Sequence, residues 1–289
     1  MKRRDMITGI FSGVAFSVGN GFLWKMASDS VPTNYGDVAL TQSEPPKAIE
    51  EAPTYLEKVR FFENEFADDV YLDQNEFSVM NAVVRRLESA QKYVGHGNFN
   101  LLGFDSLLRY ASRYESIGEF TPAELNFMEK IFFTEAKQYG FLGEKVTDKI
   151  TDAIKDSDTQ RVPHTGHYVF KGRSHAYYQK LVRDVGPQIV LTSGIRSVVK
   201  QMHLFLSKCA KSNGNLSKAS RSLAPPGHSF HGIGDFDVGR LGWGEDNFTS
   251  KFAMTDEFKK MQDLGYVQIR YTEDNQLGVR FEPWHIKVV

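Results

Sequence analysis

The sequence predicts an α+β protein, in which an all-helical region is followed by a domain built on an antiparallel sheet. From residue 55 to about 160, apolar residues recur at spacings of three and four, the period of a helix that buries one face. From residue 161 to the C-terminus, short strand-like and helical stretches follow one another without the regularity of parallel β–α–β units. That irregular order favours an antiparallel sheet with flanking helices.

Composition narrows the class of protein. The 289 residues are enough for one large domain or two modest ones, and the hydrophobic and charged contents, 41% and 25%, are those of a globular protein. A formal net charge of −1 provides no overall field for nucleic acid, so no nucleic-acid partner is expected. The single cysteine, Cys209, excludes an intrachain disulfide and a thiolate metal cluster.

Residues 1–27 are typical of a bacterial export signal. Lys2, Arg3 and Arg4 form a basic start, and no charged residue occurs from position 6 to position 24. The paired arginines suggest the twin-arginine route. Because no good small-x-small cleavage site follows, removal of the signal and its retention as an inner-membrane anchor both stay open. Either outcome predicts an exported, periplasmic protein.

The next two segments predict a linker and a helical domain. Residues 28–54 hold four prolines among polar residues and no apolar period, which is typical of a linker. Residues 55–160 carry the helical stripes, which we interpret as core-forming. Thr121-Pro122-Ala123-Glu124 is a capping box with proline at the first helical position, and Gly140 is the expected end of that helix.

Residues 161–289 predict a second domain of short mixed elements. A continuous apolar run predicts a strand, two periodic stretches predict helices, and two β-rich runs around a polar turn predict a hairpin. These elements are expected at 187–192 (strand), 198–209 and 255–264 (helices), and 266–271 with 278–281 (hairpin). The basic residues of 200–221 are interpreted as a solvated face, and His164, His167 and His175 as loop and helix-start residues.

A glycine-rich stretch, residues 225–239, is the centre of the predicted site. Its sequence, PPGHSFHGIGDFDVG, places His231 a short glycine turn before Asp235 and Asp237. On a strand the two acids point to the same face. A histidine and a carboxylate meeting there supply the nitrogen and oxygen ligands that suit zinc.

The partner of that stretch lies near the C-terminus. Glu282 and His285 are three apart in a strand-like run, which would send them to opposite faces, but Pro283 favours an edge or bulge that turns both inward. His231, Asp237 and His285 would then supply three zinc ligands and leave a fourth position open, as in catalytic sites. Glu282 would remain as the general base. Asp235 stays open as the alternative acidic ligand, although it lies only four positions after His231.

Three motifs in this order resemble one known family. They are Leu191-Thr192-Ser193-Gly194-Ile195-Arg196-Ser197, then Ser-x-His-x-x-Gly followed by an acid at 229–237, then Glu-x-Trp-His at 282–285. Together they resemble the VanY-type D-alanyl-D-alanine carboxypeptidases, zinc peptidases grouped with lysostaphin and the hedgehog fold. The resemblance covers about residues 162–289, and it is the combination that is specific, since each motif alone is weak.

The resemblance implies a fold, a cofactor and a reaction. It implies a hedgehog/DD-peptidase-like sheet, one zinc ion per chain, and hydrolysis of peptidoglycan stem peptides as a D-Ala-D-Ala carboxypeptidase. By place in the motifs, Arg196 would stabilise the oxyanion or hold a substrate carboxylate, and Ser193 and Ser229 would bind substrate. An endopeptidase of peptidoglycan and a non-hydrolytic zinc-containing cell-wall-binding module are the alternatives. Glu282 favours an enzyme, because a structural zinc site does not need it.

Overall fold

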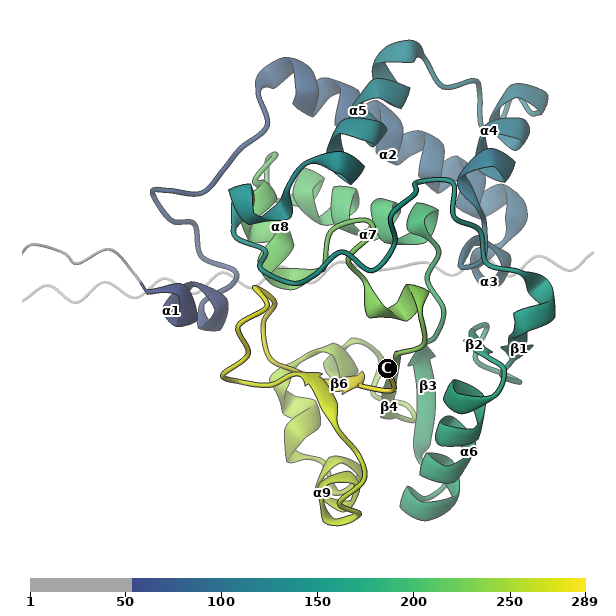
Figure 1. Cartoon of the computed structure of the whole chain (residues 1–289), viewed down its shortest axis with the longest axis vertical. Coiled ribbons are helices and arrows are strands. Elements are labelled where there is room, and N and C mark those ends of the chain that lie inside the picture. Colours follow the sequence, from purple (N-terminus) through teal and green to yellow (C-terminus); the bar gives the residue numbers. More distant parts are fainter. Residues whose placement is uncertain (1–53) are drawn as a thin grey trace, which may run out of the picture. The chain divides into compact units, whose positions relative to one another are not determined.

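The computed structural model describes residues 54–289 (Figure 1). The predicted export signal and nearly all of the predicted linker, residues 1–53, lie outside the described residues. Among residues 54–289, no helix is both long and apolar enough to cross a membrane.

Helices dominate the first half of the described chain. They are α1 (Tyr55–Arg60), α2 (Gln74–Val94), α3 (His96–Phe99), α4 (Phe104–Arg113) and α5 (Pro122–Phe133), followed by 3-10 turns at Ala136–Tyr139 and Asp156–Asp158. An isolated bridge joins Tyr71 to Asn215. The predicted capping box begins α5, since the Thr121 hydroxyl accepts from the Glu124 N–H and the Glu124 carboxylate accepts from the Thr121 N–H. Gly140 does not end α5, because that helix stops at Phe133; with φ of 93° it ends the following 3-10 turn instead.

Strands and helices are mixed in the second half. The strands are β1 (Thr159–Arg161), β2 (Tyr168–Phe170), β3 (Ile189–Ser193), β4 (Phe236–Arg240), β5 (Ile269–Tyr271) and β6 (Glu282–Ile286). The helices are α6 (Arg173–Val185), α7 (Val198–Lys211), α8 (Leu216–Ser222) and α9 (Asp256–Asp263), with 3-10 turns at Phe230–Gly232, Gly244–Phe248 and Ser250–Met254. The predicted strand at 187–192 and helices at 198–209 and 255–264 are therefore confirmed as β3, α7 and α9.

The sheets are small and antiparallel. β1 and β2 form a hairpin, and the larger sheet has the order β3-β4-β6-β5 with every neighbouring pair antiparallel. This mixture of helices with antiparallel sheets confirms the predicted α+β class. The finer hedgehog/DD-peptidase-like likeness stays a prediction.

The predicted hairpin at 266–281 is wrong in its second strand. β5 pairs with β6 at 282–286, and residues 278–281 are not in a strand. The Asn275 side chain folds the connection back on itself by bonding the carbonyls of Thr272 and Val279. The Arg280 N–H donates to the Arg221 carbonyl of α8 at 2.9 Å, so it is not available for pairing in the sheet. The backbone groups that a hairpin would need are therefore committed elsewhere.

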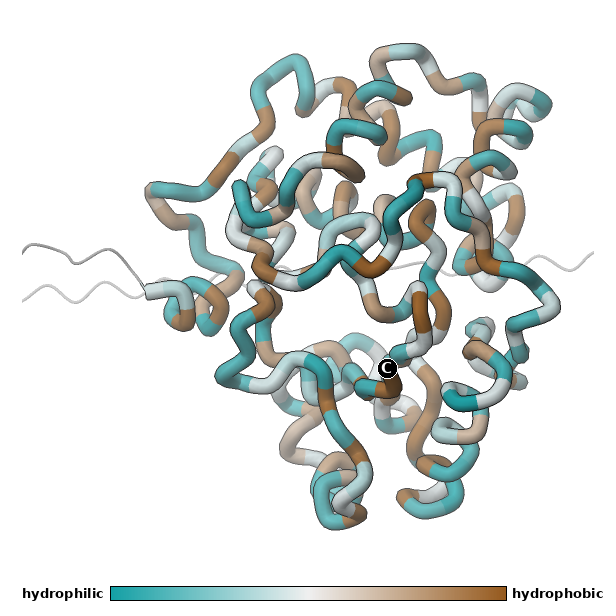
Figure 2. Tube along the Cα trace, viewed as in Figure 1, coloured by the Kyte–Doolittle hydropathy of each residue, from teal (hydrophilic) through white to brown (hydrophobic). Residues whose placement is uncertain are grey.

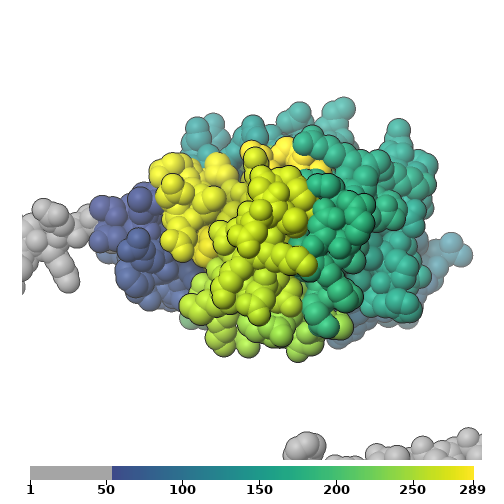
Figure 3. Space-filling model, turned by 90° about the horizontal axis from the view of Figure 1, so that it is seen from below, coloured from purple at the N-terminus to yellow at the C-terminus, as the bar shows by residue number. Residues whose placement is uncertain are grey.

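The described residues form two apolar cores. One is formed by side chains of β3, β4 and β6 with those of α6 and α9, which adjoin on the face seen from below (Figure 3). Figure 2 shows the hydrophobic run along β3 that enters this core. The other core joins α2–α5 to α7 and α8. This second core crosses the division predicted near residue 160, so the described residues, 54–289, form one compact unit, and the two-domain organisation stays a prediction.

Candidate metal centre

Three buried side chains from distant parts of the sequence meet on one face of the larger sheet. They are His231, from the 3-10 turn before β4, Asp237 on β4 and His285 on β6, and their candidate ligand atoms all lie within 4.8 Å of one another. Two imidazole nitrogens and a carboxylate oxygen are the donor set of a three-ligand zinc site.

Strand alternation explains why the three residues converge. On β4, Phe236 and Val238 enter the apolar core, so Asp237 between them points to the opposite face. Asp237 and His285 are register partners in the β4–β6 pairing, which brings their side chains together across the two strands. The cluster thus sits on the face of the sheet turned away from α6 and α9.

His231 presents one ring nitrogen to the cluster. Its Nδ1 lies 2.7 Å from the Gly194 carbonyl, to which it donates, so Nε2 is the unprotonated nitrogen in the neutral ring. Nε2 faces Asp237 Oδ1 at 3.2 Å, yet both of these buried atoms lack a hydrogen-bond partner among the described residues. Because buried polar atoms are nearly always satisfied, an atom pair of this kind fits a metal ion as the shared partner.

His285 is oriented from behind by Asp235. Its Nε2 donates to Asp235 Oδ2 at 3.2 Å, and its Nδ1 faces Asp237 Oδ1 at 3.5 Å. The Asp235 carboxylate also accepts from Arg270 Nε and from the Val288 N–H, both at 2.8 Å. Such a carboxylate behind a histidine fixes the ring in the orientation that metal binding needs. Asp235, the alternative ligand in the sequence analysis, therefore lies outside the three-residue cluster.

The cluster is strongly polarised electrostatically. Burial alone would raise the pKa of the Asp237 carboxyl, but its interaction with the His231 ring and the charge of Arg196 hold it below its usual value. Burial and the Arg196 guanidinium lower the pKa of His231 to about 4, which keeps this ring neutral. Burial would lower the pKa of His285 as well, but its hydrogen bonds to Asp235 and Glu282 raise it to about 9. Without a metal, His285 is therefore protonated at neutral pH, and metal binding would release that proton, because a carboxylate and a neutral imidazole are the forms that bind a cation.

Glu282 lies beside the cluster at an irregular point of the sheet. Ile269 pairs with Ile286 and Tyr271 pairs with Glu282. The one residue between the two pairs on β5 therefore lies opposite three residues on β6, 283–285. This irregularity falls at Pro283, where the sequence predicted it, and it brings Glu282 Oε2 to 3.4 Å from His285 Nδ1. A carboxylate at that distance from the ligand set can accept a proton from a molecule bound there.

Arg196 and Ser193 reach the cluster from the loop between β3 and α7. Arg196 Nη2 donates to Asp237 Oδ2 at 2.5 Å, and Arg196 Nε donates to Ser193 Oγ at 2.9 Å. The guanidinium thus occupies one oxygen of Asp237 and leaves Oδ1 toward the histidines. Ser229 is buried just before His231, and its hydroxyl makes no hydrogen bond to the cluster; only its backbone carbonyl is engaged, by the Gly232 N–H at 3.0 Å.

The comparison with protein families agrees with this geometry. Residues 173–289 match the model of the VanY family, described as D-alanyl-D-alanine carboxypeptidase. Residues 173–289 are a VanY domain. The matched range contains the serine–arginine loop, the His231 turn and the Glu282–His285 strand. The VanY family is one of peptidases, and the match places residues 173–289, less than half of the chain, in that class.

Solved structures with similar folds are related at low TM-score. The LdcB LD-carboxypeptidase, solved to reveal the basis of peptidoglycan recognition, has a TM-score of 0.40 and 22% identity over 47% of this chain and 70% of its own. A mutant VanY D,D-pentapeptidase of a VanB-type resistance cassette, in complex with Zn(II), has a TM-score of 0.34 and 25% sequence identity. That match covers 45% of this chain and 78% of the other. VanYB in complex with D-alanine-D-alanine has a TM-score of 0.36 and 25% sequence identity, and the match covers 48% of this chain and 80% of the other. A search of curated proteins gave no match.

A cavity of about 370 Å³ opens beside the cluster of the VanY domain. Among the residues that line it are the predicted Ser193, Arg196, Asp237 and Glu282, together with Trp284 of the Glu-x-Trp-His motif. The wall is completed by residues that sequence reasoning did not place in the site: Glu63, His167, Thr192, Lys200, Leu204, Lys208, Ser222, Leu223, Phe248 and Arg280.

Of two of these wall residues, Lys200 was wrongly interpreted as solvent-exposed, whereas His167 does lie in a loop, directly before β2, as predicted. His167, read as a loop residue, bonds Asn100 at 3.3 Å, and burial and Arg196 lower its pKa to about 4. Lys200, read as part of a solvated face, donates to Gln91 Oε1 at 3.0 Å, and burial with the nearby Arg196 lowers its pKa to about 8. The position of Lys200 carried a signal, since it lies in the first turn of α7 and helical side chains lean toward the N-terminus, here the Arg196 loop. We find no comparable signal for His167.

Proposed function

We propose that this protein is a zinc-dependent peptidase that hydrolyses peptidoglycan stem peptides, with D-Ala-D-Ala carboxypeptidase activity. The observation that carries the proposal is the buried His231, Asp237 and His285 cluster, with unpartnered Nε2 and Oδ1 atoms and the Glu282 carboxylate 3.4 Å from one ligand ring. The match of residues 173–289 to the VanY family supports the substrate class. The predicted export of the chain would place it where that substrate occurs, and we propose an exported location on that basis.

In this proposal the three-residue cluster holds one zinc ion, which polarises the scissile carbonyl and lowers the pKa of a bound water to about 7. Glu282 Oε2 accepts the proton of the attacking water and returns it to the leaving amine. Its side chain is buried at the cavity wall, which keeps bulk water from competing for that proton. Arg196, held by Ser193, directs its guanidinium at the developing oxyanion or at a substrate carboxylate.

The charges of the cavity favour a carboxypeptidase over an endopeptidase. Lys208 is paired with Glu63 at 2.6 Å, and Arg280 lies 4.0 Å from Glu282. Lys200 has no acidic partner among residues 54–289; its Nζ bonds the neutral side chain of Gln91. Lys200 therefore offers the cavity a site for an anion, whereas Arg196 is already paired with Asp237. The free C-terminal carboxylate of a stem peptide supplies that anion next to the bond that a carboxypeptidase cleaves.

Hydrolysis of defined substrates tests the proposal. Purified full-length protein is incubated with a muramyl pentapeptide and with cross-linked peptidoglycan, with and without a zinc chelator, and products are identified by mass spectrometry. The expected product is loss of one D-alanine from the pentapeptide, abolished by chelator and restored by zinc. Cleavage of cross-links alone would make the protein an endopeptidase. Bound zinc without hydrolysis of either substrate would indicate a binding module rather than an enzyme.

A further inference from the structure

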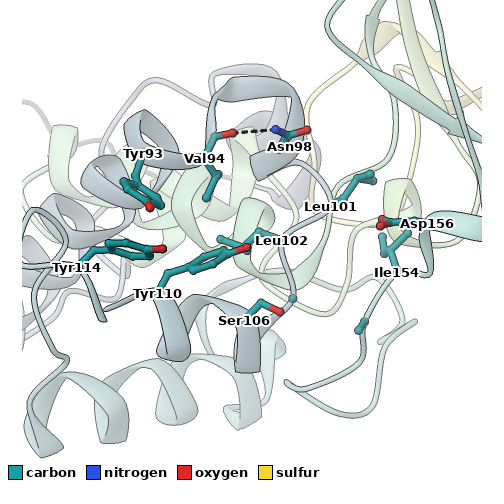
Figure 4. A pocket seen from close by; sticks show the side chains of 12 residues that line it. Tyr93, Val94, Asn98, Leu101, Leu102, Ser106, Tyr110, Tyr114, Ile154 and Asp156 are labelled. Atoms are coloured by element: carbon teal, nitrogen blue, oxygen red, sulfur yellow. Dashed lines mark hydrogen bonds between the residues drawn. The ribbon is translucent and has the colours of Figure 1, made fainter. Parts of the chain in front are cut away.

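A second and larger hollow lies on the helical half of the molecule, away from the zinc cluster. Its volume is about 590 Å³, and we call it the tyrosine hollow because Tyr93, Tyr110 and Tyr114 line one side (Figure 4). The remaining lining residues are Val94, Asn98, Leu101, Leu102, Gly103, Ser106, Ala153, Ile154 and Asp156. Nothing in the proposed hydrolysis uses this hollow.

The three tyrosines form an aromatic wall, in which Tyr110 and Tyr114 pack partly against the core and Tyr93 is exposed. Tyr93 stands at the end of α2, and its ring lies 4.2 Å from that of Tyr114 and 6.1 Å from that of Tyr110, measured between centroids. Tyr93 is 45% exposed, while the core below is closed by fully buried residues such as Leu107. An exposed cluster of aromatic rings is typical of a binding surface rather than of a packing one.

The charge of the tyrosine hollow excludes anionic polymers as its natural ligand. Asp156 is the only charged residue among those that line it, and no lysine or arginine does so. The other polar groups are neutral: the Asn98 amide, which donates to the Val94 carbonyl at 2.9 Å, and the Ser106 hydroxyl, which accepts from Arg109 Nη2 at 2.8 Å. A neutral ligand rich in hydrogen-bonding groups matches this lining.

The tyrosine hollow adjoins the catalytic cavity through a smaller one. A hollow of about 180 Å³ shares Ala153 and Ile154 with the tyrosine hollow, and it shares Arg196 with the cavity beside the zinc cluster. The three hollows therefore share lining residues in the order tyrosine hollow, small hollow, catalytic cavity.

We propose that the tyrosine hollow binds the neutral N-acetylated glycan of the polymer whose stem peptide enters the catalytic cavity. A pyranose ring presents a face of C–H groups, which packs on the negative face of an aromatic ring. Its hydroxyl and acetamido groups can bond Asn98, Ser106 and Asp156. The inference rests on the proposed function for the identity of the polymer, and it gives the helical region a role in holding the substrate.

The test measures sugar binding without any peptide. Full-length protein is titrated calorimetrically with a chitin tetrasaccharide, four N-acetylglucosamine units that carry no stem peptide. Tyr93→Ala removes one ring and should weaken binding by about five- to tenfold, the loss expected for one aromatic contact. Tyr93→Phe keeps the ring and should retain most of the affinity. Tyr71→Ala is the matched control, because Tyr71 is 46% exposed and lines none of the three hollows.

The outcomes separate this inference from the proposed function. Absence of tetrasaccharide binding, or equal binding by the Tyr93→Ala and Tyr71→Ala proteins, overturns the glycan site even if the pentapeptide is hydrolysed. Tyr93-dependent binding by a protein that hydrolyses nothing keeps the glycan site and removes the peptidase. A Tyr93-dependent affinity that is higher for an anionic polymer such as polyphosphate also overturns the neutral glycan. On intact peptidoglycan, kcat/KM relative to that on free pentapeptide should fall about fivefold in Tyr93→Ala and stay constant in Tyr71→Ala.

Discussion

Asp235 accepts a hydrogen bond from the ring nitrogen of His285 that points away from Asp237. Nε2 of the ring lies 3.2 Å from Asp235 Oδ2, while Nδ1 lies 3.5 Å from Asp237 Oδ1. Two acids that are only two residues apart therefore hold one imidazole from opposite sides. The two carboxylates differ in role as a result, because Asp237 can bind a metal and Asp235 fixes the ring that binds it.

Metal analysis of the two acids is the first prediction. Asp237→Ala should lose zinc, since it deletes the oxygen at the centre of the cluster. Asp235→Asn should keep a zinc site with affinity weakened about 10- to 100-fold, the usual cost of altering a group that orients a ligand. Zinc content after dialysis and a chelator competition measure both. Loss of zinc from the Asp235 variant with retention in the Asp237 variant would contradict the assignment.

The second prediction concerns Glu282. Glu282→Gln preserves the shape of the side chain at the cavity wall and removes its ability to take a proton, so zinc should be retained while turnover falls by at least about 10²-fold. Pentapeptide hydrolysis and zinc content are measured on the same preparation. A rate close to that of the unchanged protein would assign the general base to another residue.

The main features of the site could be predicted because strand chemistry is local. Strand alternation and Pro283 were visible in the sequence, and they account for the inward turn of Asp237, Glu282 and His285. The strand at 278–281 was mispredicted because its backbone groups are claimed by non-local partners, such as the Arg221 carbonyl. No local pattern shows a hydrogen bond between residues so far apart in the chain.

The cavity wall was the least predictable part for the same reason. His167 and Glu63 line it from outside the VanY domain, and Lys200 is held by Gln91 of α2. Their placement depends on how the helical region packs against α7, a contact that no motif encodes. Ser229 shows the converse: its place in a motif predicted substrate binding, and the fold buries it in a turn where only its backbone carbonyl is bonded.

The third prediction is that Arg196→Lys impairs catalysis without loss of metal. The guanidinium makes two directed bonds, to Asp237 and to Ser193, and an ammonium group cannot reproduce that planar fork. kcat/KM on the pentapeptide should fall, with zinc content unchanged. Ser193→Ala leaves the guanidinium in place and removes one of its supports, so its effect on kcat/KM should be smaller. Unaltered kcat/KM in Arg196→Lys would remove Arg196 from the reaction.

The fourth prediction concerns an ion pair that joins the start of the described chain to α8. Asp69 accepts from Arg221 Nη1 at 2.6 Å, and the two side chains are 2% and 6% exposed. Arg221 was read from sequence as part of a solvated face, so its burial is a correction. Asp69→Asn leaves the guanidinium buried without its counter-charge, which should lower the free energy of unfolding by about 3 kcal/mol at pH 7. Asp68→Asn is the control, because Asp68 is 68% exposed and its pair with Lys58 lies at the surface; its effect should stay within about 0.5 kcal/mol.

The same pair makes this loss depend on pH. Burial alone would raise the pKa of Asp69, but the hydrogen bonds from Arg221 and Asn215 hold it below its usual value. A lowered pKa in the folded state means that the carboxylate stabilises the protein above the unfolded-state pKa of about 3.9, and that this stabilisation disappears as the pH falls through the folded-state value. Urea unfolding at several pH values should therefore show a difference between the original protein and Asp69→Asn that is constant near neutrality and shrinks below about pH 4. A difference that stays constant down to about pH 3 would mean that the Asp69 charge is not what stabilises this contact.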